Sequence, residues 1–235
     1  MLAIFKKEMR SYFTGAIGYA FLVIFLAVGA ALFCLTTLFA MTADVSTYFV
    51  YMMVFSGVML PLLTMKSFSE ERKIKTEQLV LTSPVSLVSM VMGKFLAAFT
   101  VFAGATLVSS FSFVVLYRYA SVKTAMLLGN LVALLLVGMT FISIGLFVSS
   151  LTENQLSAAV GTIAIILVFL AIGIVNLLFP SSYFLRYVFD FLSIFTRFQA
   201  FTNGYFDLSS LVYYLSISAL FLYLTVRVYD RRRHA

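Results

Sequence analysis

The stretch AMLLGNLVALLLVGMTFISIGLFVSSL, residues 125–151, has no charged side chain over its whole length. A helix rises 1.5 Å per residue, so about 20 apolar residues cross the hydrocarbon core of a bilayer, and this run is long enough to do so. The strands of membrane barrels instead show about ten residues of alternating polarity, and this run lacks that alternation. The stretch therefore predicts a transmembrane α-helix.

Five further uncharged runs have the same character, and they are Ala16–Phe39, Tyr48–Met65, Phe95–Tyr117, Leu156–Phe179 and Leu208–Val226. Hydrophobic residues make up 63% of the chain and charged residues 11%. In soluble domains about one half of the residues are hydrophobic and about one quarter are charged. Six spans use most of the 235 residues, which leaves little room for a soluble domain. The sequence thus predicts an all-α fold with six transmembrane helices in a single membrane domain, residues 1–235.

The distribution of lysine and arginine predicts the orientation of these helices. If the N-terminus is cytoplasmic, only Arg118, Lys123, Arg186 and Arg197 fall outside, and the other 12 of the 16 basic residues fall inside. Cytoplasmic segments carry such an excess, so both termini are expected in the cytoplasm. The multi-pass chain is expected in the cell membrane, as a protein of a bacterial inner or cytoplasmic membrane. The excess of basic residues in cytoplasmic segments accounts for the net charge of +7, so nucleic-acid binding is not needed to explain it.

The residues before the first span have the pattern of an amphipathic helix. Apolar side chains recur every three or four residues while basic side chains occupy the other face, which is typical of a helix at a membrane surface. The apolar members are Leu2, Phe5, Met9 and Tyr12, and the basic members are Lys6, Lys7 and Arg10. The alternative is a generic positively charged flank of the first span.

Motifs that would indicate catalysis are absent from the sequence. It contains neither the H-E-x-x-H zinc motif nor the G-x-S-x-G nucleophile motif, and Gly93–Lys94 lacks the glycine loop that holds phosphates. We therefore expect no catalytic residue, no metal and no cofactor. The spans also lack the interior charged residues that ion-coupled carriers use. A secondary carrier or channel that needs no ATPase remains the alternative to a transport subunit driven by a partner.

The most polar stretch is SEERKIKTEQLVLTSPVS, residues 69–86, between the second and third spans. Within the slightly longer segment 67–86, the apolar residues Phe68, Ile74, Leu79 and Leu81 lie among the charged residues. This pattern favours a short interfacial helix that docks on a partner and ends before Pro84, since proline disfavours helix at the residue before it. An ordinary cytoplasmic loop is the alternative. Thr152 and Gln155, between the fourth and fifth spans, have the spacing of a capping box.

The polar stretch also resembles the coupling-helix region of the type-2 ATP-binding-cassette (ABC) exporter permeases. The family usually has a glutamate, Gly-Thr, leucines, Ser-Pro-Val-Ser and then Gly-Lys, and this chain has these residues at Glu71, Thr76, Leu79, Leu81, Ser83 to Ser86, Gly93 and Lys94. Lys75 stands where the family usually has glycine, which leaves the geometry of that turn open. The stretches at 149–159 and 191–215 are similar to the same family, most of all to its gliding-motility branch.

The resemblance implies that this chain pairs with a second copy or a homologous permease, and that each presents its coupling helix to a separate ATPase subunit that binds ATP. It allows an accessory extracytoplasmic subunit, and membrane lipids are expected neighbours. The residues that it implies for coupling are Glu70, Glu71, Arg72, Thr76, Leu79, Leu81, Pro84, Gly93 and Lys94. Glu71 is expected either to cap the docking helix or to pair with a basic residue of the ATPase.

The resemblance further implies a short re-entrant segment on the outer side, before the last span. Residues 183–206 fit this expectation because they hold ten Phe or Tyr residues but are interrupted by charges, so they are unsuited to crossing. Its candidate residues are Tyr183, Arg186, Asp190, Arg197 and Gly204. An interfacial aromatic belt is the alternative.

Overall fold

The computed structural model describes residues 1–42, 44–78, 86–119, 124–178, 193–202 and 207–234. These residues are almost entirely helical, and no strand occurs among them. The α-helices are α1 (Leu2–Thr14), α2 (Ala16–Phe33), α3 (Ser46–Thr64), α4 (Lys66–Lys73), α6 (Leu87–Ser110), α7 (Ser112–Tyr119), α8 (Thr124–Leu151), α9 (Gln155–Leu178), α11 (Ile194–Thr202) and α12 (Leu208–His234). A π-helix, η1 (Cys34–Leu38), extends α2.

Six helices in the described part of the chain are long and apolar enough to span a membrane, which confirms the predicted all-α fold. They cover Ala16–Leu38, Ser46–Lys73, Leu87–Leu116, Thr124–Leu151, Gln155–Gly173 and Leu208–Arg233. Three of them extend well beyond the uncharged runs, and the last does so by continuing from Val226 to Arg233. The second continues from α3 through Met65 into α4, and the third begins at Leu87, capped by the Ser86 hydroxyl, which accepts from the Ser89 N–H.

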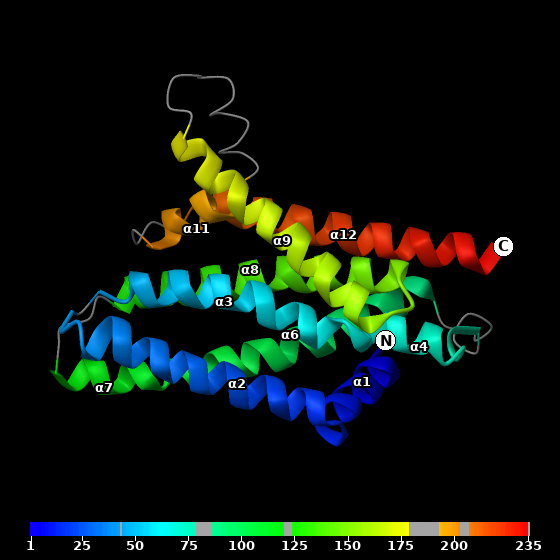
Figure 1. The fold of residues 1–235 in the computed structure, drawn as a ribbon, viewed down its shortest axis with the longest axis horizontal. Coiled ribbons are helices and arrows are strands. Elements are labelled where there is room, and N and C mark those ends of the chain that lie inside the picture. Colours follow the sequence, from blue (N-terminus) through cyan, green and yellow to red (C-terminus); the bar gives the residue numbers. More distant parts are fainter. Residues whose placement is uncertain (43, 79–85, 120–123, 179–192, 203–206, 235) are drawn as a thin grey trace.

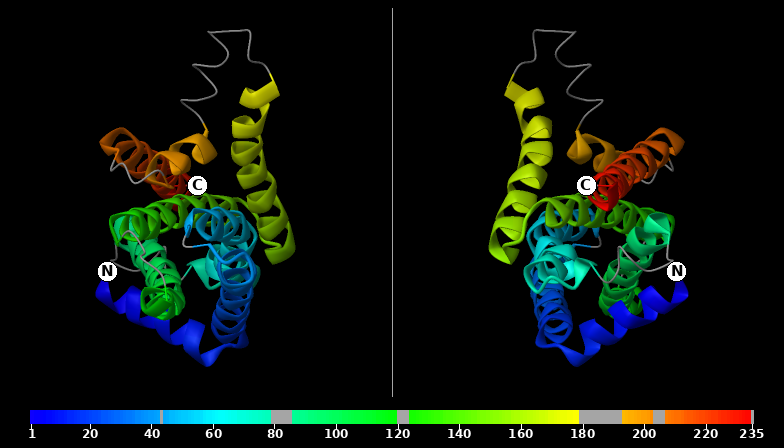
Figure 2. Two further views of the ribbon diagram at one scale, coloured as in Figure 1. Left: turned by 90° about the vertical axis from the view of Figure 1, so that its left-hand side faces the viewer. Right: turned by 90° about the vertical axis from the view of Figure 1, so that its right-hand side faces the viewer.

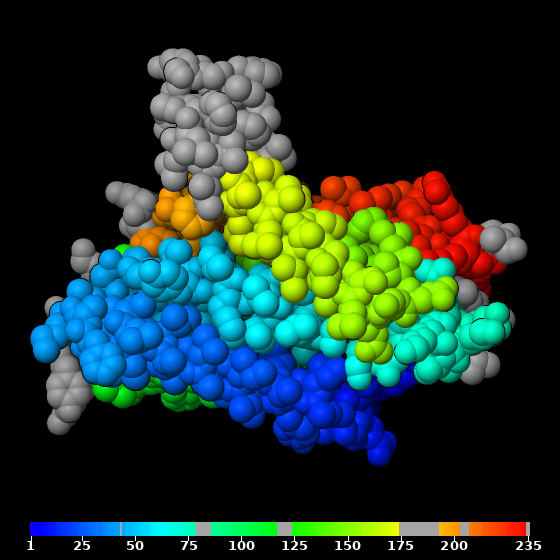
Figure 3. Space-filling view, in the orientation of Figure 1, coloured from blue at the N-terminus to red at the C-terminus, as the bar shows by residue number. Residues whose placement is uncertain are grey.

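Helix α8 is the central element of the bundle. It contacts α3, α4, α6, α9, α11 and α12, and most of its side chains are buried. Gly138 lets α6 approach it closely, because a Cβ atom at this position would overlap the ring of Phe102. In contrast, the outer faces of α9 and α12 are exposed and apolar, as expected of lipid-facing helices; α9 forms part of the surface in Figure 3.

Figure 1 shows that α4 and the C-terminus lie toward one end of the bundle, whereas α7 and α11 lie toward the other. We refer to the first of these as the α4 end. Both termini lie nearer to the α4 end, in agreement with an even number of spans. Which end faces the cytoplasm stays a prediction.

Helix α1 crosses the outside of α2 and α6 (Figure 2). Its amphipathic character is as predicted, but its apolar side contacts the bundle: Tyr12 is buried, and Phe5 and Met9 pack against the core. Leu2, expected on the same face, is 83% exposed. The location of α1 at the membrane surface stays a prediction.

Candidate functional site

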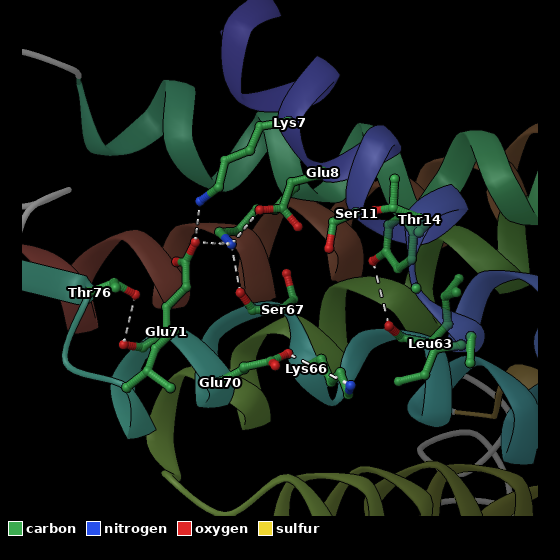
Figure 4. Close-up of a pocket in the computed structure, with 16 residues that line it drawn as sticks. Lys7, Glu8, Ser11, Thr14, Leu63, Lys66, Ser67, Glu70, Glu71 and Thr76 are labelled. Atoms are coloured by element: carbon green, nitrogen blue, oxygen red, sulfur yellow. Dashed lines mark hydrogen bonds and ion pairs between the residues drawn. The ribbon is translucent and has the colours of Figure 1, made fainter.

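A buried lysine holds three helices together at the α4 end (Figure 4). Lys94, in the second turn of α6, has a side chain that is only 2% exposed. Its Nζ lies 2.9 Å from Glu8 Oε1 of α1 and 3.1 Å from Glu71 Oε1 of α4, and it donates to the Ser67 carbonyl at 2.6 Å. A buried charge is costly unless it is paired and hydrogen-bonded, and these three acceptors meet that need.

Lys7 of α1 completes this cluster. Its Nζ lies 2.9 Å from the same Glu71 oxygen, so two lysines and two glutamates balance each other. Burial lowers the pKa of Lys7, but the hydrogen bond and charge of Glu71, aided by Glu8, outweigh burial and raise this pKa above its ordinary value. Glu71 therefore pairs within the chain in this structure, and its pairing with a basic residue of the ATPase stays a prediction.

Helix α4 is also fixed to α8 by Ser149. The Ser149 hydroxyl accepts from the N–H groups of Phe68 and Ser69 at 3.1 and 3.2 Å and donates to the Met65 carbonyl at 3.1 Å. These are N–H groups of the first turn of α4, which lack partners within a helix. Phe68 is fully buried, with its ring 4.9 Å from that of Tyr229 and 4.9 Å from Lys94 Nζ. Phe68 thus anchors α4 in this chain and does not face a partner.

Arg72 joins α4 to the turn between α8 and α9. Its Nε lies 3.0 Å from Glu153 Oε1, and its Nη1 donates to the Leu151 carbonyl at 3.0 Å. The predicted capping box is wrong, because α9 begins at Gln155 and its N-cap is Asn154, whose Oδ1 accepts from the Leu156 N–H at 3.0 Å.

The turn after α4 has the geometry that glycine favours, although lysine occupies it. Lys75 has a φ of 57°, in the left-handed region. The N–H groups of Ile74 and Lys75 donate to the carbonyls of Glu70 and Arg72 at 3.0 and 3.1 Å, which closes the helix end. Thr76 follows and donates to the Glu71 carbonyl at 3.3 Å. The turn geometry left open by the sequence is therefore that of a left-handed helix C-terminus.

The last helix reaches the same segment through Arg232. Its Nη1 lies 3.0 Å from Glu77 Oε1, and its Nη2 donates to the Ser150 carbonyl at 2.7 Å. The guanidinium carbon lies 5.3 Å from the centre of the Tyr229 ring. The basic residues at the C-terminus predict the orientation of the chain but not this contact. A tyrosine three residues before an arginine on a helix was the available signal, since the two share one face.

The remaining predicted residues divide into three groups. The Glu70 carboxylate lies 4.0 Å from Lys66 Nζ, a long and exposed ion pair. Gly93 allows α1 to pack on α6, because a Cβ atom there would lie 3.0 Å from Ile4 Cγ2. The predicted residues outside the described part of the chain are Leu79, Leu81, Pro84, Tyr183, Arg186, Asp190 and Gly204.

Arg197 is the member of the outer set that the structure describes. It lies in α11, away from the α4 end, where Nη1 donates to the Ser209 hydroxyl at 2.7 Å and lies 3.9 Å from Asp207 Oδ2. Asp207 caps α12, since its carboxylate accepts from the N–H groups of Ser209 and Ser210. Arg197 thus connects α11 to the start of the last span.

These contacts bring the charged segment, defined here as residues 66–78, against α1, α6, the α8–α9 turn and α12. The chain is thus a polytopic helical membrane protein in which several elements contact one short charged segment at the α4 end. The family model of the ABC-2 family transporter proteins matches residues 2–232. The chain belongs to this family and is a multi-pass membrane component of transport rather than a catalytic subunit. Permeases of the family generally work with an ATP-binding subunit. Among curated proteins, none matches this chain.

Proposed function

We propose that this chain is the permease subunit of an ABC exporter and that a separate ATP-binding subunit drives it by moving the charged segment. The observation that carries the proposal is that Glu71, Arg72 and Glu77 of this segment each pair with a different neighbouring element. A displacement of the segment would therefore act on α1, α6, the α8–α9 turn and α12 together. Export, the cell membrane and pairing with a second permease rest on the family resemblance.

The surface offered to the ATPase would be the tip of α4 and the turn after it. Ile74 is 61% exposed there, between the exposed side chains of Lys73 and Lys75. An apolar residue with basic neighbours is complementary to a groove on the ATPase that has acidic edges and an apolar floor. The charges would steer association, and the buried apolar side chain would supply affinity. The family resemblance also assigns Leu79 and Leu81 to docking on the ATPase.

The two parts of the segment should respond differently to substitution. Ile74→Asp, or Leu79→Ala combined with Leu81→Ala, should reduce co-purification of the chain with its ATPase. Glu71→Gln should leave co-purification intact but uncouple ATP hydrolysis from transport, because it weakens the ion pairs to Lys94 and Lys7 and not the docking surface. Lys123→Ala, in a loop predicted to lie outside, is the control and should do neither.

The same experiments separate this proposal from a carrier or channel. The purified chain alone should hydrolyse no ATP, and activity should appear only with the ATP-binding subunit. If Ile74→Asp and Glu71→Gln assemble and transport like the parent, the charged segment has no coupling role. Transport by the chain alone, without the ATPase and without ATP, would favour the carrier or channel.

A further inference from the structure

Four residues of α1 form an exposed face on the side of the helix away from the bundle. Leu2, Lys6, Arg10 and Phe13 follow one another at steps of four, four and three residues, so they lie along one face. All four side chains are exposed. Helix α1 packs on α2 and α6, and Figure 2 shows no other described helix on its far side. We refer to these four residues as the outer face of α1.

The charges of α1 are sorted between its two sides. Glu8 is the one acidic residue of this helix and points inward to Lys94. On the outer face, Lys6 and Arg10 make no ion pair with any residue that the structure describes. They are four residues apart, so their like charges lie on adjacent turns and repel each other. An anion bound between them would replace this repulsion with two attractions.

The backbone that carries these two cations is held in place from the opposite side. Glu8 is fixed by its buried ion pair, and Tyr12 is 8% exposed against the core. Gly18 allows α2 to fold back closely on the end of α1, because a Cβ atom there would overlap the carbonyl group of Tyr12. The outer face is therefore formed before a ligand arrives, which lowers the cost of binding.

The outer face lies where the lipid head groups meet the hydrocarbon core. Only Gly15 separates α1 from the first span, which begins at Ala16. The ring of Phe13 meets that of Tyr19 edge-on, with 6.0 Å between their centres, and both side chains are exposed. Tyrosine is enriched at this level of a membrane. The cations one and two turns before Phe13 are thus expected at the level of the lipid phosphates.

An anionic phospholipid matches this face in both charge and polarity. Its phosphate oxygens accept hydrogen bonds from Lys6 and Arg10, which carry only donors. Leu2, which is 83% exposed, and Phe13 lie at the two ends of the cationic pair and can contact the apolar part of the lipid. A zwitterionic lipid carries its own cation beside the phosphate, and the two basic side chains would repel it.

We propose that the outer face of α1 binds an anionic phospholipid, with the phosphate between Lys6 and Arg10 and the apolar part against Leu2 and Phe13. The proposal does not depend on the ATPase or on coupling. One basic residue near an anionic membrane surface strengthens the attraction about fivefold. The face should therefore prefer phosphatidylglycerol to phosphatidylcholine by at least about fivefold.

Tryptophan fluorescence can test this preference, because the chain contains no tryptophan and Phe13→Trp adds a single reporter to the outer face. The purified full chain is reconstituted into mixed bilayers of phosphatidylglycerol and phosphatidylcholine with identical acyl chains. In each sample one of the two lipids is brominated near its head group, so that it quenches tryptophan on contact. Brominated phosphatidylglycerol should quench as if it were about fivefold enriched beside the reporter. Lys6→Gln combined with Arg10→Gln, in the same background, should remove this enrichment.

Two controls match these changes. Arg231→Gln combined with Arg233→Gln removes the same charge from exposed positions at the C-terminus and should keep the parental enrichment. Phe39→Trp reports from the far end of the first span, where Phe39 is 78% exposed, and the two lipids should quench it equally. Lys6 and Arg10 are exposed, so their double variant should fold, and its melting temperature should equal that of the parent.

Equal quenching of Phe13→Trp by the two lipids would show that the outer face does not select an anionic lipid. An enrichment that survives the loss of Lys6 and Arg10 would place its cause elsewhere in the chain. The same loss in the Arg231 and Arg233 variant would reduce it to the general charge of the α4 end. Quenching by neither lipid would show that this face is turned to water or to a protein partner. Each of these four results would overturn the proposal.

Discussion

The Nζ atom of Lys94 lies 2.9 Å from Oε1 of Glu8, although 86 residues separate the two along the chain. Both side chains are buried, and the pair closes α1 onto α6. Removing one partner leaves a buried charge without one of its counter-ions, which is more costly than losing an exposed pair. The ion pair is therefore a structural requirement for the position of α1.

Replacing Glu8 with alanine should lower the free energy of unfolding by about 2–3 kcal/mol, because the Lys94 charge then keeps only part of its compensation. Chemical unfolding in detergent, followed by circular dichroism, measures the change. Glu70→Ala is the matched control, since its pair with Lys66 is exposed and long, and it should cost less than about 0.5 kcal/mol. Equal costs for the two variants would contradict the buried role of Glu8.

Lys75→Gly should stabilise the chain by about 1 kcal/mol, since a non-glycine residue with positive φ carries a strain that glycine avoids. Lys73→Gly, at the last position of α4, should instead destabilise it, because glycine is unfavourable in a helix. Melting temperatures of the two variants test this opposition. A loss of stability in Lys75→Gly would mean that the lysine side chain makes a contribution larger than the strain.

Two ion pairs of the charged segment should differ in strength according to their burial. The side chains of Arg232 and Glu77 are 25% and 13% exposed, whereas those of Arg72 and Glu153 are 29% and 63% exposed. Double-mutant cycles with alanine should give a coupling free energy of about 1 kcal/mol or more for Arg232–Glu77 and about 0.5 kcal/mol or less for Arg72–Glu153. The reverse order would show that burial does not govern these contacts.

Asp207→Ala should lower the free energy of unfolding by about 1 kcal/mol, because α12 loses its N-cap. Asp207→Asn should lower it much less, since asparagine is also a good N-cap. The Ser210 hydroxyl, then the two backbone N–H groups and Arg197, outweigh the small effect of burial and lower the pKa of Asp207 below its ordinary value of 3.8. A lowered pKa stabilises the fold above that value, and the contribution is lost as pH falls through the folded-state pKa. Asp207→Asn should therefore melt with less dependence on pH below about 4 than the parent.

Accessible cysteines would test the predicted orientation, in a Cys34→Ser background. Met41, between the first two spans, is 94% exposed and is predicted to lie outside, and Lys73 is exposed at the α4 end. A membrane-impermeant maleimide added to intact cells should label Met41→Cys at once but Lys73→Cys only after permeabilisation. Labelling in the opposite order would invert the topology.

The fold could be predicted from the sequence because uncharged runs of this length have few alternatives in a membrane. Their ends were less predictable: the third helix begins at Leu87 and not at Phe95, because the Lys94 charge is neutralised by Glu8 and Glu71. The candidate site was likewise predictable only in part. The family resemblance predicted Glu71 and Lys94 as site residues. It did not predict that they contact each other, that Arg232 pairs with Glu77, or that Ser149 binds the start of α4. These contacts depend on packing between distant helices, which no local pattern encodes.

The continuity of α3 and α4 has a mechanical consequence. Together they form one helical stretch of 28 residues, Ser46–Lys73, which at 1.5 Å per residue is about 42 Å long. The tip beside Ile74 and the buried Tyr48 near the opposite end thus belong to a single lever. A tilt of about 10° about one end would displace the other by about 7 Å over this length. The lever would bend at Pro61, which lacks a backbone donor, and at Met65, after which the N–H groups of Phe68 and Ser69 donate to Ser149 and not to the preceding turn.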